Sequence, residues 1–377
     1  MIHTDYDIAI VGLGPAGATL ARMLKPGLSI LALDAKRKEH GEDGGFHKPC
    51  GGLLAPDAQR ALARFNLTLP LRVLVDPQIF FVRTIDAVSG LIRNYPRHYI
   101  NLNRHAFDHW LISLIPDQVH VRKGARCTAV ERMPGGYRLS WRELGASQDL
   151  GQSADRTATA RYLVGADGAS SFVRSVLRPG FRMRKYTAIQ QWFEDRHPKP
   201  FYSCVFDDRV TDCYAWGLTK NQHFIFGGAF DPRHAPKRFD ALKETMRTYA
   251  FRLDHPVKTE ACLVLRPQHP AAIDCGGDGL FLLGEAAGFI SPSSLEGLSY
   301  AFDSARKLAA ILNSDTPAPE DAYFRATLDL RLKLLGKIAK CPFIFSPPLR
   351  RLVMRSGIGS ISVLEADSNS PSQAPSL

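Results

Sequence analysis

Three glycines near the start of the chain, Gly12, Gly14 and Gly17, have the spacing of a loop that binds a pyrophosphate. Gly12 permits a tight turn after a strand, and Gly14 lets the backbone approach a phosphate with no Cβ between them. Gly17 allows the following helix to pack closely on that strand. Pro15 and Ala16 lie at the helix N-terminus, where free N–H groups and the helix dipole favour negative charge. These residues predict contacts with the phosphates of a dinucleotide.

Two short apolar runs flank this loop and are the elements that must position it. Residues 6–11 form a β-branched run typical of a buried parallel strand, and residues 28–33 form a second such run. Asp34 follows the second run, 22 residues after Gly12, close to the ~20 residues expected for a ribose-binding acid. A carboxylate there accepts a hydrogen bond from a ribose 2′-hydroxyl and repels a 2′-phosphate. We expect Asp34 and the adjacent Ala35 to lie beside the ribose.

The composition is that of a globular chain large enough for two domains. The 377 residues are 45% hydrophobic, and domains typically contain ~100–200 residues. Seven cysteines without a C-x-x-C pair fit neither a disulfide framework nor a zinc site, so we expect a reducing cytoplasm and no metal centre. Asp5 and Asp7 precede the first apolar run, which argues against a signal peptide. Because no run approaches ~20 apolar residues, we expect no transmembrane anchor.

The net charge of +11 is concentrated near the C-terminus. Residues 325–355 contain eight Lys or Arg and one acid, Asp329, so this segment contributes +7. Leucines are interleaved with these charges, and a basic amphipathic helix of this kind can lie on an anionic membrane surface. Peripheral contact with the inner face of the membrane through residues 320–355 is therefore one expectation, and a terminal helix that packs its leucines on the protein body is the other. Aromatic residues are not interleaved for base stacking, so we expect no nucleic-acid partner.

The order of the remaining motifs predicts a discontinuous domain. Nucleotide-type patterning occurs at the start of the chain, returns at 161–171 and returns again at 279–297, with strand-rich segments between these parts. The sequence therefore predicts an α/β fold with a Rossmann-like domain into which an antiparallel β-sheet domain is inserted. Further strands are predicted at 79–85, 91–95, 119–121, 125–130, 137–141, 161–166, 201–206, 213–218 and 223–230. A polar loop is predicted at 145–157. Helices are predicted at 56–65, from 103 to 111, at 238–251 and, after residue 297, up to residue 310.

Three separated signatures give the chain a family resemblance: Gly12-x-Gly14-x-x-Gly17, Gly165-Ala-Asp167-Gly168 and Gly284-Glu285-Ala-Ala-Gly288. Their combination resembles the flavoprotein superfamily of aromatic hydroxylases, in which all three surround FAD. Within that superfamily, Lys48-Pro-Cys50-Gly51-Gly52 and Tyr214-Ala-Trp216-Gly-Leu-Thr-Lys220 resemble the geranylgeranyl reductase branch. The resemblance extends to about residue 315. It implies an FAD-binding domain in three parts, 1–75, 101–180 and 265–318, and a substrate domain in two parts, 76–100 and 181–264. Beyond it, charge and composition predict a basic helical segment at 319–365 and a disordered Ser/Pro-rich tail at 366–377.

By this resemblance, two of the glycine-containing segments contact the middle and the flavin end of FAD. Asp167 and Gly168 are expected near the pyrophosphate, with the aspartate assigned to a nucleotide hydroxyl. The segment from Gly284 to Gly288 is expected to bring an acid to the ribityl chain and a helix N-terminus to the pyrimidine edge of the flavin. Superfamily members usually have Asp where this chain has Glu285, whose longer side chain reaches the same hydroxyl directly or through water.

Arg104 and Gly297 are two further residues that the resemblance places beside FAD. Arg104 begins an R-x-x-F-D-x-x-L segment that resembles the segment of a family arginine close to the cofactor. The alternative for Arg104 is an ion pair with Asp108, one helical turn later. Gly297 follows Glu296 in a region that approaches the isoalloxazine in this branch.

Cys50 is the candidate for chemistry at the flavin ring. Gly51 and Gly52 remove side chains around it, and the branch places Lys48, Cys50 and both glycines beside the cofactor and the substrate cavity. The thiol could be redox-active, donate a proton or only fill space. Tyr214 and Trp216 are the other candidate catalytic residues.

The two aromatic residues lie two positions apart, so on a strand Tyr214 and Trp216 face the same side and suit the wall of an apolar substrate cavity. The alternative is an ordinary sheet core.

Together these features predict an FAD-dependent oxidoreductase. We expect reduction of a C=C bond of an apolar substrate, for example an isoprenoid lipid, by hydride transfer from reduced flavin. The chain has no second G-x-G-x-x-G loop, so NADPH or NADH would bind transiently or another carrier would deliver the electrons. Two alternatives stay open: an FAD-dependent monooxygenase of an aromatic or polycyclic compound, and a non-catalytic FAD-containing protein that binds a membrane surface.

Overall fold

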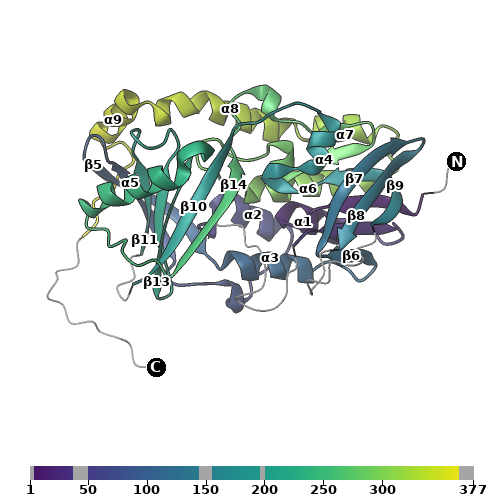
Figure 1. The fold of residues 1–377 in the computed structure, drawn as a ribbon, viewed down its shortest axis with the longest axis horizontal. Helices are drawn as coiled ribbons and strands as arrows, with labels where there is room; N and C mark the ends of the chain where they lie inside the picture. Colours follow the sequence, from purple (N-terminus) through teal and green to yellow (C-terminus); the bar gives the residue numbers. More distant parts are fainter. Residues whose placement is uncertain (1–3, 37–49, 144–154, 196–199, 365–377) are drawn as a thin grey trace.

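Two β-sheets of eight strands each form the frame of the part of the chain that the computed structural model describes, residues 4–36, 50–143, 155–195 and 200–364. Helices cover both sheets, and the chain passes from one sheet to the other several times (Figure 1). The predicted α/β class, with a discontinuous Rossmann-like part and an inserted sheet, is confirmed.

The first sheet contains the strands on which the glycine loop depends. Its main path has the order β15-β16-β9-β1-β2-β6, and β1 is parallel to both β2 and β9. In register, Ile10 lies between Ala32 and Val164, and all three are buried, as central parallel strands covered on both faces require. The strands of this sheet are β1 (Tyr6–Val11), β2 (Ile30–Asp34), β6 (Val119–Lys123), β7 (Ala125–Met133), β8 (Gly136–Glu143), β9 (Arg156–Gly165), β15 (Gly276–Gly277) and β16 (Leu280–Leu282).

Five helices pack on or beside this sheet: α1 (Pro15–Met23), α2 (Pro56–Arg64), α3 (Arg104–Ser113), α4 (Phe172–Leu177) and α6 (Leu298–Leu312). Helix α1 begins at Pro15, whose fixed φ suits the first helical turn. Helix α3, predicted to begin near residue 103, is capped by Asn103, whose Oδ1 accepts from the N–H of Ala106 at 3.0 Å.

The second sheet has the order β14-β10-β13-β12-β11-β4-β5-β3. Its neighbours are antiparallel except β11 and β4, which are parallel, so the expectation of a wholly antiparallel sheet is corrected at this pair. The reason is that the β4–β5 hairpin comes from a distant part of the chain, and no tight turn fixes its direction relative to β11. The strands are β3 (Leu53–Leu54), β4 (Ile79–Asp86), β5 (Leu91–Asn101), β10 (Lys185–Glu194), β11 (Phe201–Phe206), β12 (Ala215–Lys220), β13 (His223–Phe230) and β14 (Lys258–Leu265).

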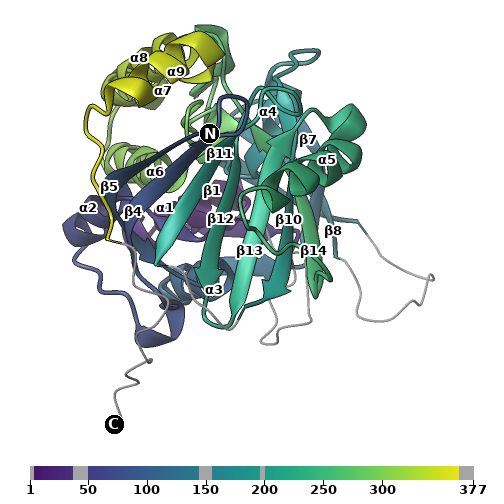
Figure 2. The same ribbon diagram turned by 90° about the vertical axis from the view of Figure 1, so that its left-hand side faces the viewer.

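Helix α5 (Ala235–Arg247) covers one face of the second sheet through Phe239, Leu242 and Met246. The opposite face carries Tyr186, Tyr214 and Trp216. Figure 2 shows the strands of the second sheet side by side, with α5 in front of β10 and β13 and the first sheet behind them. The inner face of the second sheet is therefore the one that can contribute to a site shared with the glycine loop.

Several element boundaries differ from those that the sequence predicted. Strand β9 begins at Arg156, earlier than expected, because its first half pairs with β8. Strand β12 begins at Ala215, so Tyr214 lies immediately before it. Strand β5 continues to Asn101, well beyond the predicted end at residue 95, and the helix predicted at 238–251 is α5, Ala235–Arg247. The remaining predicted elements are present with small shifts at their ends. The predicted loop at 145–157 and the predicted tail at 366–377 fall wholly or mostly outside the described residues.

The basic C-terminal segment forms three helices rather than one: α7 (Pro319–Ala326), α8 (Leu328–Phe345) and α9 (Pro347–Ser356). The chain turns before the Pro347-Pro348 pair, because proline lacks the N–H that a continuing helix needs. The three helices lie along one edge of the molecule (Figures 1 and 2). In the described ranges, none of the helices is both long enough and apolar enough to cross a membrane.

Candidate functional site

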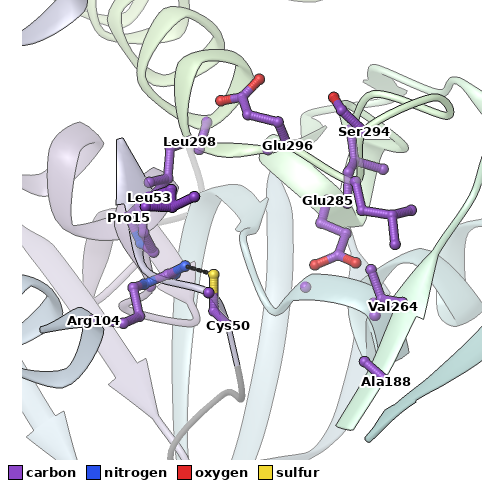
Figure 3. Close-up of a pocket in the computed structure, with 18 of the residues that line it drawn as sticks. Pro15, Cys50, Leu53, Arg104, Ala188, Val264, Glu285, Ser294, Glu296 and Leu298 are labelled. Atoms are coloured by element: carbon purple, nitrogen blue, oxygen red, sulfur yellow. Dashed lines mark hydrogen bonds between the residues drawn. The ribbon is translucent and has the colours of Figure 1, made fainter. Parts of the chain in front are cut away.

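A cavity of about 1360 Å³ is lined by residues of both sheets, the glycine loop, the Cys50 loop and α8. Its volume exceeds the ~300–1,000 Å³ typical of sites for one small ligand. In Figure 3, Pro15, Cys50 and Arg104 lie on one side, and Glu285, Val264 and Ala188 lie on the other. The cavity is therefore large enough for a dinucleotide together with a second molecule.

The glycine loop forms one end of the cavity, and its three glycines have different surroundings. Gly12 has a φ of +99°, and a Cβ there would lie 2.5 Å from the carbonyl oxygen of Ala166. A Cβ on Gly17 would lie 1.9 Å from the carbonyl oxygen of Gly12, which shows how closely α1 packs on β1. A Cβ on Gly14 would meet no atom within 4 Å, because this residue faces the open cavity together with Pro15 and Ala16. The backbone at Gly14 is thus open to approach by a phosphate group.

Asp34 ends β2 at the same end of the cavity and is 6% exposed. Its Oδ2 accepts from the N–H of Leu13 at 3.1 Å, and its Oδ1 accepts from the N–H of Lys36 at 2.8 Å. Asp34 and Ala35 both line the cavity. The carboxylate therefore fixes the glycine loop against β2 while it borders the space predicted for a ribose.

Asp167 and Gly168 also line this end of the cavity. We call the part of the cavity lined by the glycine loop, Asp34, Asp167 and Gly168 the loop end. The Asp167 carboxylate accepts from the N–H of Phe172 at 2.7 Å, from the N–H of Val173 at 3.2 Å and from the Ser171 hydroxyl. It thereby holds the first turn of α4 as well as facing the cavity. Burial raises the pKa of Asp167, although these hydrogen bonds oppose the increase.

Glu285 enters the cavity from the side opposite Arg104 (Figure 3). Its Oε1 accepts from the N–H of Leu265 at 2.9 Å, so the longer side chain bridges to β14. The predicted helix N-terminus at Gly284–Gly288 is wrong, because this segment is a short 3₁₀ helix, Gly284–Ala287. The helix that starts at the cavity is α6, which begins at Leu298 after Gly297.

Three of the predicted cofactor residues lie behind the cavity surface and are not part of its lining: Gly17, Gly284 and Gly288. A Cβ on Gly288 would lie 2.2 Å from the carbonyl oxygen of Ala272, and one on Gly284 would lie 3.1 Å from the Cβ of Ala16. These glycines allow backbone segments to pack closely behind the site. Gly297, by contrast, lines the cavity beside Glu296 and Leu298.

Cys50 and Arg104 contact each other at the middle of the cavity. The Nη1 of Arg104 donates to the Cys50 Sγ at 3.5 Å, and the N–H of Gly52 donates to the same sulfur at 3.4 Å. Arg104 also forms the predicted ion pair with Asp108, Nε to Oδ1 at 2.8 Å, and both side chains are at most 15% exposed. Burial lowers the pKa of Arg104, but Asp108 and Cys50 raise it by more, so the net direction is upward. Lys48, predicted beside them, lies outside the described residues.

Lys220 is a buried charged residue at this site that the sequence analysis did not select. Its Nζ donates to Asn101 Oδ1 at 2.7 Å, to the Leu102 carbonyl at 2.6 Å and to the Gly52 carbonyl at 3.5 Å. Burial lowers the pKa of Lys220 to about 7. Lys220 thereby holds the glycine part of the Cys50 loop, and a Cβ on Gly52 would lie 2.7 Å from its Nζ. The sequence signal that could have identified Lys220 is its position as a lysine at the end of an otherwise apolar strand.

Tyr214 and Trp216 line the other end of the cavity, on one face of the sheet as predicted. Their ring centroids are 6.0 Å apart in an edge-on arrangement. The Tyr214 hydroxyl donates to the Ser294 carbonyl at 2.6 Å, and the Trp216 Nε1 donates to Gln190 Oε1 at 3.2 Å. Burial raises the pKa of Tyr214 well above its ordinary value. Both rings are part of the sheet core, and their role as the wall of a substrate cavity stays a prediction.

Four further aromatic residues line the cavity, Tyr95, Tyr99, Tyr202 and Phe206, and the last three belong to its aromatic end. Tyr202 and Phe206 lie on one face of β11, and the Tyr202 ring is 6.1 Å from the ring of Tyr99 on β5. The alternating pattern of residues 201–206 could have indicated that Tyr202 and Phe206 share one face of a strand. Their convergence with Tyr214 and Trp216 depends on the β11–β4 pairing, which the sequence did not predict.

Besides Arg104, five cationic residues line the cavity: Lys36, Arg60, Arg97 of β5, and Lys337 and Lys340 of α8. Lys337 donates to the Ser291 hydroxyl at 3.3 Å, and its Nζ lies 5.4 Å from the centre of the Tyr300 ring. Burial lowers the pKa of Lys337. The cavity therefore combines an aromatic wall with positive charge.

Comparison with known proteins places the chain close to one set of curated relatives. Protein CbrA of Shigella sonnei (strain Ss046) is 51% identical over 360 residues, which cover 96% of this chain and 99% of the relative. No protein-family model matches the chain.

Two solved structures share the fold at low sequence identity. A geranylgeranyl bacteriochlorophyll reductase-like protein from Thermoplasma acidophilum has a TM-score of 0.73 and 18% identity, covering 92% of this chain and 90% of that chain. PqsL, a probable FAD-dependent monooxygenase from Pseudomonas aeruginosa, has a TM-score of 0.68 and 17% identity, covering 94% of this chain and 99% of that chain. At these identities the similarity shows the fold alone.

Proposed function

The chain belongs to the CbrA family, and from this we propose that it is an FAD-dependent oxidoreductase that reduces a C=C bond of an apolar substrate, such as an isoprenoid. The observation that carries the proposal is the cavity itself, because its loop end and its aromatic end are continuous. The reductase-like and monooxygenase neighbours of the same fold support flavin chemistry in general.

The residues at the loop end fit the nucleotide part of FAD. Gly14 offers open space beside the N-terminus of α1, where a diphosphate is favoured. Asp34 and Asp167 border the same space with carboxylates that their hydrogen bonds hold in place. Glu285 and Gly297 would hold the flavin end from the opposite side. When bound, FAD would supply hydride transfer to the substrate, with NADPH or NADH as the proposed source of electrons.

Reduction of a C=C bond adds a hydride to one carbon and a proton to the other, so the protein must supply a proton. We assign this role to the Cys50 thiol, because it lies on the cavity between the two ends. Arg104 and the N–H of Gly52 donate to its sulfur and would stabilise the thiolate that remains. Solvent then returns the proton to Cys50.

The substrate end favours an apolar molecule that also carries an acidic group. Tyr202, Tyr214 and Trp216 provide a wall with little capacity for specific polar contacts, since the Tyr214 hydroxyl and the Trp216 Nε1 already donate within the protein. Lys337 and Lys340 line the same cavity and would attract a negative group on the substrate.

The proposal is tested first by identifying the cofactor and then by the mass of the product. Purified protein should release FAD on denaturation, identified by chromatography and absorbance. The enzyme, reduced without oxygen and incubated with acidic polyprenyl compounds, should yield products heavier by two hydrogens. Products heavier by one oxygen after aeration would instead show a monooxygenase. FAD without turnover of such compounds under either condition would support the non-catalytic alternative.

A further inference from the structure

Exposed apolar side chains lie along the outer surface of α7, α8 and α9, which we call the C-terminal face. Along α8, Leu328, Leu332, Gly336, Ala339 and Phe343 recur at every third or fourth position and are all exposed, so they share one side of the helix. Leu332 is 57% exposed and Leu352 of α9 is 67% exposed. The large apolar side chains of the face are Phe324, Leu328, Leu332, Phe343, Leu349, Leu352 and Val353.

The C-terminal face is the second apolar side of helices that already pack on the protein through another side. Leu330 and Leu334 of α8 and Met354 of α9 are buried. Arg350 of α9 is buried and pairs with Asp86, Nε to Oδ2 at 3.1 Å, and with Asp208. Because these contacts anchor the helices, the exposed leucines and phenylalanines are not needed to hold them in place.

The charge of this segment indicates what covers the face. Residues 330–364 contain seven Lys or Arg and no Asp or Glu. Two of the seven are in ion pairs: Lys333 pairs with Asp57, and Arg350 pairs with Asp86 and Asp208. Lys337 and Lys340 line the cavity, and the remaining three, Arg331, Arg351 and Arg355, with Arg325 at the end of α7, border the apolar face with positive charge. A second copy of the chain would bring the same positive charge against itself, which disfavours self-association through this face.

We propose that the C-terminal face docks the protein on an anionic lipid bilayer, with α8 and α9 lying in the plane of the lipid headgroups. Apolar side chains on one side of a helix with adjacent Lys and Arg are the combination that binds such surfaces. Helices α7, α8 and α9 share one edge of the molecule, so they can meet a flat surface together (Figures 1 and 2).

Docking in this way would bring part of the cavity lining close to the bilayer. Lys337, Lys340 and Ile344 belong to α8 and line the cavity from the other side of that helix. A lipid substrate would then have a short path from the bilayer to the aromatic end. Binding to vesicles requires no turnover, so the docking surface can be tested independently of the proposed reaction.

The test is flotation of the full chain with vesicles of phosphatidylcholine mixed with phosphatidylglycerol, and with vesicles of phosphatidylcholine alone. We expect binding to the anionic vesicles that weakens as salt is added. The double variant Leu332→Glu/Leu352→Glu should bind at least about tenfold more weakly. Its matched control, Leu71→Glu/Val257→Glu, changes two exposed apolar residues outside the three helices and should bind like the original protein. Arg325→Glu/Arg355→Glu should weaken binding roughly fivefold for each cation lost.

Three results would overturn the proposal. The first is an absence of binding to anionic vesicles by the folded full chain. The second is equal binding by Leu332→Glu/Leu352→Glu and its control. The third is a dimer, measured by analytical ultracentrifugation, that this variant abolishes while vesicle binding is absent, because the face would then be a contact between copies.

Discussion

The two ends of the cavity are built in different ways. At the loop end, the short segment between β1 and α1 supplies the backbone that faces the cavity at Gly12 and Gly14, and Asp34 and Asp167 follow the two strands that pair with β1. At the aromatic end, Tyr99, Tyr202 and Tyr214 come from three separate segments at the second sheet. The glycine loop is therefore determined locally, whereas the aromatic end depends on how distant strands pair.

This difference predicts how each end responds to substitution. At the loop end, a side chain that intrudes on the ligand should remove binding without affecting the fold. In the middle and at the aromatic end, the residues that face the cavity also hold the structure, so function and stability should change together.

The largest expected effect is at Gly14. Gly14→Asp adds a carboxylate to open space, where the backbone φ of −68° accepts any residue. Like charge beside a phosphate costs several kcal/mol, so FAD affinity should fall on the order of 1,000-fold while thermal stability without cofactor stays unchanged. Flavin content and titration of apoprotein with FAD measure the effect. Gly14→Ala adds a Cβ without a charge, so as the neutral control it should weaken FAD binding much less than the aspartate variant; normal FAD affinity in the aspartate variant would remove this end from the cofactor site.

The next largest effect is expected at Arg104. Arg104→Met removes the ion pair with the largely buried Asp108 carboxylate, which should lower the free energy of unfolding by about 3 kcal/mol. The double variant Arg104→Met/Asp108→Asn should recover much of that stability in urea unfolding. If Arg104 also contacts the cofactor, the recovered variant will still bind FAD weakly. Normal FAD affinity in the double variant would show that the arginine is structural.

A smaller effect is expected at Cys50, in the middle of the cavity. Loss of a proton donor typically slows the chemical step about 100-fold, so Cys50→Ala should lower kcat by about that factor with little change in FAD content. Cys204→Ala is a matched control, because Cys204 lines the aromatic end and lacks the Arg104 contact. An unchanged kcat in Cys50→Ala would assign the thiol a space-filling role.

The most specific effect, and the smallest for a change of one pH unit, is the pH dependence of stability at Lys220. Burial lowers the pKa of Lys220 to about 7 in the folded protein, against about 10.5 when exposed. Between these values only the unfolded state carries the extra proton, so folded stability should rise with pH. Relative to Lys220→Met, the free energy of unfolding should increase by up to roughly 1.4 kcal/mol per pH unit between pH 7 and 10. If the difference in free energy of unfolding between the two proteins does not change with pH, the three oxygen acceptors keep the Lys220 ammonium charged.

The sequence predicted the elements around the glycine loop well because their signals are local. Gly12, Gly14 and Gly17 act through steric limits that hold within one strand-turn-helix unit, and the cap at Asn103 acts within one helical turn. The error at Gly284–Gly288 arose because a pattern of glycines does not distinguish a 3₁₀ turn from the start of an α-helix.

The sequence by itself determined the family, the order of the elements and the position of the loop end. Tertiary structure decided which distant side chains share the cavity: the parallel β11–β4 pair that brings Tyr99 to Tyr202, and the buried position of Lys220 behind Gly52. It also decided which leucines of α8 are buried and which stay exposed. The physical reason is that local rules fix backbone conformation within a few residues, whereas contacts between distant segments depend on the packing of the whole chain.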